Sequence, residues 1–94
     1  VIAQMEGGII FALTAALYGE ITIKDGIPQQ TNFHDYQLLR MNEAPKVDVY
    51  IIASDESPTG VGEPGVPPLA SAVANAITAK TGQFFYKLPL KLDT

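Results

Sequence analysis

The sequence predicts an α+β fold in which two helices pack on a small, mostly antiparallel sheet. Three observations support this class: two windows with apolar residues at helical spacing, an Asp-Gly dipeptide between two β-prone segments, and one segment in which apolar and polar residues alternate. The expected order is helix, β-hairpin, strand, helix, strand. At 94 residues, the chain is long enough for a single domain, residues 1–94, with a thin core.

The first helix is predicted over residues 4–17. Its apolar residues recur at helical spacing, Glu6 suits the positive end of a helix, and Gly19 can end it. Further apolar side chains widen this surface beyond a single stripe; they are Ile10, Phe11 and Ala15. We therefore expect the helix to be covered on more than one side.

A β-hairpin is predicted next. The Asp-Gly dipeptide at 25–26 favours a two-residue type I′ turn, so residues 20–24 and 27–33 should pair in an antiparallel hairpin. In this register Pro28 faces Ile23 at a non-hydrogen-bonded pair. The missing proline N–H is tolerated there if the strand lies at an edge.

The middle of the chain contains two loops and one predicted strand. Residues 32–45 have no clear period and are expected to form a long connection, which in a compact domain is more often functional than idle. Residues 46–53 alternate apolar and polar side chains, which predicts a third strand. Residues 54–66 form a second loop that is rich in glycine, proline and acidic residues.

The second helix is predicted to start with Pro67 or Pro68 in its first turn and to end at Gly82. Proline suits a first turn because the N–H that it lacks would have no helical partner there. The aromatic segment that follows, residues 83–88, predicts a short final strand before Pro89. Its aromatic side chains are expected in core and edge positions.

Composition excludes several classes of function. The six Lys and Arg residues are scattered and the net charge is −4, so no basic face is available for nucleic acid. The chain has no cysteine and His34 is its one histidine, so we expect no metal ligands within it. Apolar residues 9–18 are too few to span a bilayer, and the basic segment of a signal peptide is missing. Localisation therefore stays open between cytoplasm and periplasm.

Apolar content and the chain start suggest that partners are needed. Hydrophobic residues make up 47% of the sequence and charged residues only 17%, which is apolar for so small a body. Some of the apolar surface should therefore be covered by a partner or by self-association. The chain starts with Val, and we expect this to be a boundary within a longer protein.

The loop before the second helix contains one acid in an unusual setting. Glu63 lies between glycines and is followed by Pro64, which disfavours helical geometry at Glu63 itself. Gly60, Gly62 and Gly65 can bring backbone close to a ligand. The residues alone leave two interpretations open: a solvated turn near the positive end of the second helix, or a carboxylate presented to a ligand.

Three segments resemble the molybdenum hydroxylase family, the group of xanthine oxidase and aldehyde oxidoreductase. They are the opening AQMEGG with the residues after it, then NFHDYQLLRMNEAP, then SDESPTGVGEPGVPPLASAVANAI, in that order over nearly the whole chain. The pattern is similar to the C-terminal part of the large catalytic subunit, in the branch that acts on isoquinoline-like substrates. The resemblance implies an oxidoreductase that uses water to hydroxylate nitrogen heterocycles or to oxidise aldehydes.

The same resemblance implies roles for three residues. Glu63 would be the active-site base, Gln4 would contact the pterin cofactor, and Gly62 would bring backbone near that cofactor. A turn held by glycine and proline suits a base, because it positions the carboxylate with little freedom. For Gln4, the residues alone also allow an amide at a fraying helix start.

The resemblance also implies a cofactor and partners. The cofactor of the parent enzyme would be molybdopterin in its cytosine dinucleotide form, with none bound to this chain alone. The partners would be the remainder of the large subunit and a small iron-sulfur subunit, with a homo-oligomer through apolar surface as a further option. We expect the 94 residues to be catalytically inert alone, although they carry the base. The alternative is a non-catalytic binding or structural module derived from such an enzyme.

Overall fold

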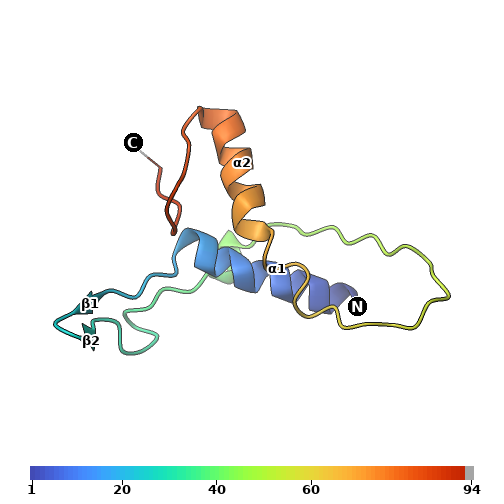
Figure 1. Ribbon diagram of the computed structural model, residues 1–94, viewed down its shortest axis with the longest axis horizontal. Coiled ribbons are helices and arrows are strands. Elements are labelled where there is room, and N and C mark those ends of the chain that lie inside the picture. Colours follow the sequence, from blue (N-terminus) through green and yellow to red (C-terminus); the bar gives the residue numbers. More distant parts are fainter. Residues whose placement is uncertain (93–94) are drawn as a thin grey trace.

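The computed structural model describes the chain up to residue 92, and this part contains two α-helices and one two-stranded antiparallel sheet. Helix α1 (Ile2–Leu17) lies along the molecule and helix α2 (Leu69–Thr81) rises from it (Figure 1). Strands β1 (Ile23–Lys24) and β2 (Ile27–Pro28) form a hairpin beyond the end of α1. These elements confirm the predicted α+β class.

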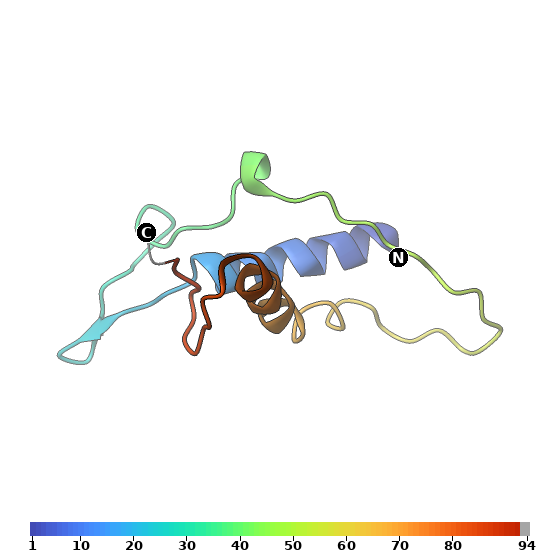
Figure 2. The same ribbon diagram turned by 90° about the horizontal axis from the view of Figure 1, so that it is seen from above.

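The molecule is extended for its length. Its principal-axis extents are 53 × 33 × 25 Å and its radius of gyration is 16.0 Å, whereas a compact domain of this size has a radius of gyration of about 12 Å. Figure 2 shows why: the long connection between η1 (Met41–Glu43) and α2 sweeps away from the helices, and the hairpin projects from the other end. Within the described residues, the core lies where α1 meets the C-terminal segment, while the middle of the chain stays outside it.

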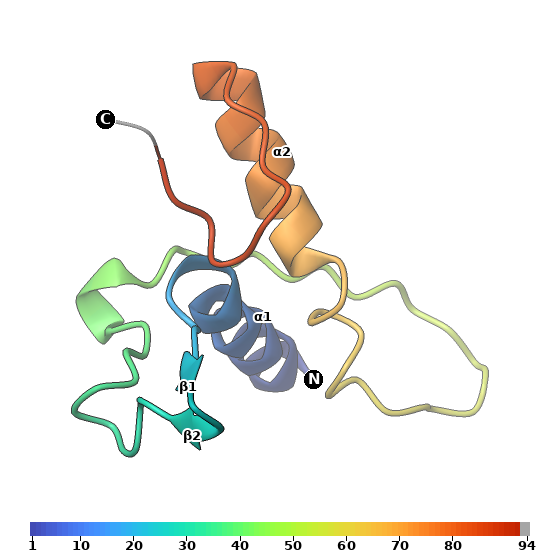
Figure 3. The same ribbon diagram turned by 60° about the vertical axis from the view of Figure 1, so that its left-hand side comes forward.

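The buried core is small and joins α1 to the C-terminal segment. It consists of Ala12, Leu13 and Ala16 of α1 together with Pro89 and Leu90. The C-terminal segment returns from the far end of α2 to the end of α1 (Figure 3), where the N–H of Leu90 donates to the carbonyl of Ala16 at 2.7 Å. Helices α1 and α2 also contact each other directly.

The ends of both helices follow from backbone hydrogen bonds. Helix α1 begins two residues earlier than predicted, and it ends where the N–H groups of Tyr18 and Gly19 both donate to the carbonyl of Thr14. Helix α2 ends as predicted at Gly82, whose φ of 79° is the left-handed conformation that glycine adopts easily. Pro68 lies just before the helix rather than inside it.

The hairpin matches the predicted turn and register but is shorter. Ile23 pairs with Pro28, and the turn residues Asp25 and Gly26 have φ values of 52° and 77°, as a type I′ turn requires. The N–H of Gln29 donates to the carbonyl of Thr22, which lengthens the ladder slightly. Each strand has only two residues, and within residues 1–92 no third strand joins the sheet.

Two predicted strands are wrong for the part of the chain that the structure describes. Residues 46–53 and 83–88 lie outside any sheet, and the hairpin does not contact the helices. In the first segment Val47 and Val49 are half-buried while Tyr50 is exposed, so the alternation does mark two different faces. Alternation reports which side chains share a face, but a strand also needs a neighbour for its backbone.

Apolar side chains are also more exposed than predicted. Phe11 is 74% exposed, so within residues 1–92 one stripe of α1 is buried and the opposite side is not. In the aromatic segment Phe85 is half-buried, whereas Phe84 and Tyr86 are exposed. A chain with so small a core cannot cover all of its apolar residues, because burial requires a second layer of structure.

Candidate active-site turn

Residues 62–68 form two consecutive turns that lead into α2. The N–H of Val66 donates to the carbonyl of Glu63 at 2.7 Å, and the N–H of Leu69 donates to the carbonyl of Val66 at 3.3 Å. Pro64 lies inside the first turn, where its fixed φ removes conformational freedom. The backbone from Glu63 onward is therefore constrained. We call residues 62–66 the Glu63 turn.

The Glu63 turn lies directly on the N-terminal half of α1. If Gly65 carried a Cβ atom, that atom would lie 2.9 Å from Cγ1 of Ile9. A Cβ atom on Gly8 of the helix would lie 3.2 Å from the carbonyl oxygen of Gly62. The two surfaces approach this closely because glycine has no side chain at either contact.

This packing brings together the residues that the sequence predicted for the site. Nε2 of Gln4 lies 3.1 Å from the position that a Cβ atom on Gly62 would occupy. Gln4 is exposed, so its amide is free to contact another molecule. Gln4 thus lies beside Gly62, the residue before Glu63, while the roles of both toward a cofactor remain predictions.

Glu63 itself is exposed and borders an open hollow of about 390 Å³. The hollow is lined by Gly60, Gly62, Glu63, Pro64 and Pro67. Within the described residues, the Glu63 carboxylate takes part in none of the hydrogen bonds or ion pairs. A carboxylate without a partner, on a constrained turn at the edge of a hollow, can accept a proton from a molecule placed in that hollow.

A second acid, Glu43, accepts hydrogen bonds at both of its carboxylate oxygens. Its carboxylate accepts a hydrogen bond from the backbone N–H of Arg40 and another from the hydroxyl of Tyr18, each at 2.9 Å. The Arg40 N–H, followed by the Tyr18 hydroxyl, lowers the pKa of Glu43, and the same Glu43 bond raises the pKa of Tyr18. Arg40 and Glu43 have the spacing of a capping box, but only its Glu43 half is formed, because an arginine side chain cannot accept a hydrogen bond from the Glu43 N–H.

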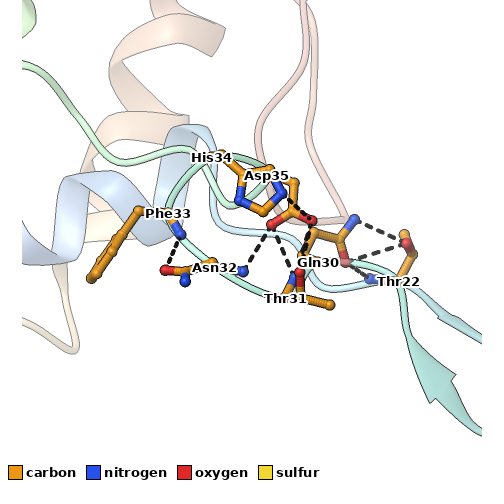
Figure 4. Close-up of polar contacts among 7 residues, drawn as sticks. All are labelled: Thr22, Gln30, Thr31, Asn32, Phe33, His34 and Asp35. Carbon is orange, nitrogen blue, oxygen red and sulfur yellow. Dashed lines mark hydrogen bonds and ion pairs between the residues drawn. The ribbon is translucent and has the colours of Figure 1, made fainter.

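A polar cluster fastens the loop after the hairpin (Figure 4). The carboxylate of Asp35 accepts hydrogen bonds from the N–H groups of Thr31 at 2.9 Å and Asn32 at 3.0 Å. The Asn32 N–H is the main cause that lowers the pKa of Asp35. His34 is exposed and lies 3.5 Å from the same carboxylate. These contacts support a structural role for the cluster.

The described part of the chain contains neither a metal-binding cluster nor a helix able to span a membrane. Among residues 1–92 there is no group of three or more His, Cys, Asp or Glu side chains that could hold a metal ion. In the same residues, neither helix is both long and apolar enough to cross a bilayer.

Comparison with known proteins identifies relatives along nearly the whole chain, although no family model matches. The isoquinoline 1-oxidoreductase subunit beta of Brevundimonas diminuta is 41% identical over 95% of this chain. A membrane-bound aldehyde dehydrogenase of Gluconacetobacter polyoxogenes, named for pyrroloquinoline quinone, is 33% identical over 95%. The xanthine dehydrogenase molybdenum-binding subunit of Escherichia coli O157:H7 is 30% identical over 93%.

The chain is therefore homologous to a segment of subunits of the molybdenum hydroxylase family, the xanthine oxidase group of oxidoreductases. Within that family its relatives include the isoquinoline 1-oxidoreductase beta subunit, which confirms the resemblance found in the sequence. The chain spans only 11% to 12% of the length of these three relatives. Their names describe proteins of which this chain matches a small part.

Proposed function

We propose that this chain is the C-terminal segment of the catalytic subunit of a molybdenum hydroxylase, and that it supplies the active-site base, Glu63. One observation carries the proposal: the carboxylate of Glu63 has no partner within residues 1–92, yet its turn lies on α1 beside Gln4. A base must be free to take a proton and must be held where the proton is lost. The Glu63 turn meets both requirements.

The residues present fit a pterin cofactor. A side chain on Gly62 would meet the amide of Gln4, so glycine at this position lets the backbone before Glu63 lie against that amide. That amide can donate and accept hydrogen bonds at the edge of a pterin ring. When bound, the molybdenum cofactor would supply the two-electron redox chemistry. No metal-binding cluster exists among the described residues, so the groups that hold the metal would lie elsewhere.

In this proposal each residue has a separate task. Glu63 accepts the proton that water loses as its oxygen is transferred to the substrate. Gln4 orients the cofactor by hydrogen bonds, and Gly62 allows that cofactor to lie against the turn. The substrates are nitrogen heterocycles of the isoquinoline type or aldehydes, which the names of two relatives support. The cytosine dinucleotide form of molybdopterin is part of the same proposal.

The partners follow from exposed apolar surface. Several large apolar side chains are almost fully exposed, among them Met41 at 94%, Tyr86 at 93% and Ile52 at 90%. Such surface is costly in water and marks places where other protein packs. We assign these contacts to the remainder of the large subunit, with a small iron-sulfur subunit completing the enzyme and self-association as a further option. The 94 residues alone would be inert.

The test is Glu63→Gln in the full-length enzyme, since it removes the base and keeps the shape of the side chain. Turnover per bound molybdenum should fall by about 10² to 10⁴, the usual contribution of a general base, with metal content unchanged. The control is Glu56→Gln, which neutralises another exposed acid of the same loop and should leave turnover within about twofold.

Equal turnover in the two variants would contradict the catalytic role of Glu63. It would favour the alternative, a non-catalytic module that uses the acidic loop as a partner contact. Metal analysis of the same preparations checks the cofactor separately. An enzyme that is active without molybdenum, and with pyrroloquinoline quinone bound, would contradict the molybdopterin part of the proposal.

A further inference from the structure

We infer that Gly8 and Gly65 are positioning residues: they let the Glu63 turn lie directly on α1 and thereby set the place of the Glu63 carboxylate relative to Gln4. The inference rests on the proposed function, because it concerns the same base. It adds that two glycines, neither of which touches the reacting atoms, control how well that base works.

A side chain added at Gly8 would displace the backbone next to Glu63. A Cβ atom on Gly8 would lie 3.2 Å from the carbonyl oxygen of Gly62 and 3.9 Å from Cγ2 of Val66. The first distance is shorter than ordinary van der Waals contact, so the neighbour must move by a few tenths of an ångström. That neighbour is backbone, and the next residue along it is Glu63.

The contact at Gly65 lies between the same turn and the same helix. A Cβ atom there would lie 2.9 Å from Cγ1 of Ile9 and 3.7 Å from Cε of Met5. Isoleucine is branched at Cβ and has little rotamer freedom in a helix, so Cγ1 cannot swing away as the tip of a long side chain could. An added methyl group would lift the turn from the helix.

The turn moves as one unit because it is closed internally. The hydrogen bond from the Val66 N–H to the Glu63 carbonyl, 2.7 Å long, closes residues 63–66 into one turn that directly follows Gly62 and includes Gly65. Gln4, in contrast, belongs to α1 and lies one helical turn before Gly8, on the same face. A shift of the turn therefore changes the position of Glu63 relative to Gln4.

Gly7 provides a matched control one residue away. It is exposed, and a Cβ atom there would have nothing within 4 Å. Alanine at either position raises the helix propensity of α1 by the same amount. Gly7→Ala and Gly8→Ala thus differ in whether the new methyl group meets the Glu63 turn.

The experiment compares Gly7→Ala, Gly8→Ala and Gly65→Ala in the full-length holoenzyme. We expect kcat per bound molybdenum to fall about 10-fold to 100-fold for Gly8→Ala and Gly65→Ala. A misplacement of about 1 Å can cost about 100-fold in rate, and a smaller shift of the carboxylate costs less. KM and molybdenum content should stay within about twofold, and Gly7→Ala should keep kcat within about twofold.

A second set of variants separates positioning from general damage. When Gly8→Ala is added to Glu63→Gln, the further loss in kcat should be less than about threefold, because the effects of residues that act as a unit are not additive. A purely structural defect would reduce kcat in both backgrounds equally. If Gly8→Ala yields no soluble holoenzyme, Gly65→Ala provides the same comparison.

The outcomes distinguish this inference from the proposed function. If Gly8→Ala or Gly65→Ala matches Gly7→Ala in kcat, or if the losses add fully to that of Glu63→Gln, the positioning role is wrong while Glu63 remains the base. If Glu63→Gln alone leaves kcat unchanged, the proposed function itself is wrong.

Discussion

The two ends of α1 hold glutamates in opposite ways. Near its N-terminal end, the turn that carries Glu63 is held by close glycine contacts, and the carboxylate is left without a partner. Near its C-terminal end, Tyr18 and the backbone of Arg40 both donate to Glu43. Packing against α1 fixes the backbone that carries Glu63, whereas the Glu43 carboxylate itself fixes a loop by accepting hydrogen bonds.

This difference separates a candidate base from a structural acid. Donors around Glu43 stabilise its ionised form, so its pKa is lowered and it is a poor proton acceptor. Within residues 1–92, the Glu63 carboxylate accepts no hydrogen bond. An exposed acid in a rigid turn can look idle in isolation, yet it is the one still available for chemistry.

The largest expected effect separates the two glutamates by turnover. In the full-length enzyme, Glu63→Gln should lower kcat by about 10² to 10⁴, whereas Glu43→Gln should leave kcat per bound molybdenum within about threefold. The reason is that Glu43 lies at the opposite end of α1 and fastens a loop. Steady-state kinetics on both variants measures the difference. Similar losses of kcat in the two variants would contradict the separate roles of Glu63 and Glu43.

The next effect tests the core that joins the C-terminal segment to α1. Leu90 is 8% exposed and Leu92 is 53% exposed. Leu90→Ala should lower the free energy of unfolding by about 2 kcal/mol, at the lower end for a core leucine because this core is small. Leu92→Ala should change it by less than about 0.5 kcal/mol. Thermal unfolding of the subunit, calibrated by calorimetry, gives both values; similar losses would mean that Leu90 is not a core residue.

The smallest effect is a dependence of local stability on pH, near Glu43 at the C-terminal end of α1 and in the loop that Asp35 fastens. The folded-state pKa of Glu43 lies below its ordinary value of 4.5, and that of Asp35 below 3.8. Both contributions to stability are therefore present above those values and are lost as pH falls through the lowered pKa values. The contribution of Tyr18, whose pKa is raised from 10.0, is instead lost at alkaline pH.

Amide hydrogen exchange measures this local loosening. After correction for intrinsic rates, protection of the Arg40 and Asn32 N–H groups should be high at about pH 6 and lower at about pH 3. In Glu43→Gln the Arg40 N–H should lose this pH dependence while the Asn32 N–H keeps it. An unchanged profile at Arg40 would show that Glu43 does not hold this loop.

Local sequence signals predicted the parts of the fold that local physics controls. The Asp25-Gly26 turn, the hairpin register and the helix end at Gly82 are correct, because each depends on backbone angles that particular residues favour. The strands predicted at residues 46–53 and 83–88 are wrong. Residues 46–53 alternate apolar and polar side chains and residues 83–88 are rich in aromatic ones, but no neighbouring strand among residues 1–92 pairs with the backbone of either segment.

The sequence by itself determined the two helices, the tight turn of the hairpin and the family, since periodicity, turn residues and ordered motifs are all written along the chain. It also singled out Glu63, Gln4 and Gly62 as site residues through that family resemblance. Only the tertiary structure decided that Gln4 lies beside Gly62, and that Gly8 and Gly65 bring the turn and the helix together. Contacts between distant segments depend on how closely two backbones can approach, and that distance is set when the chain folds.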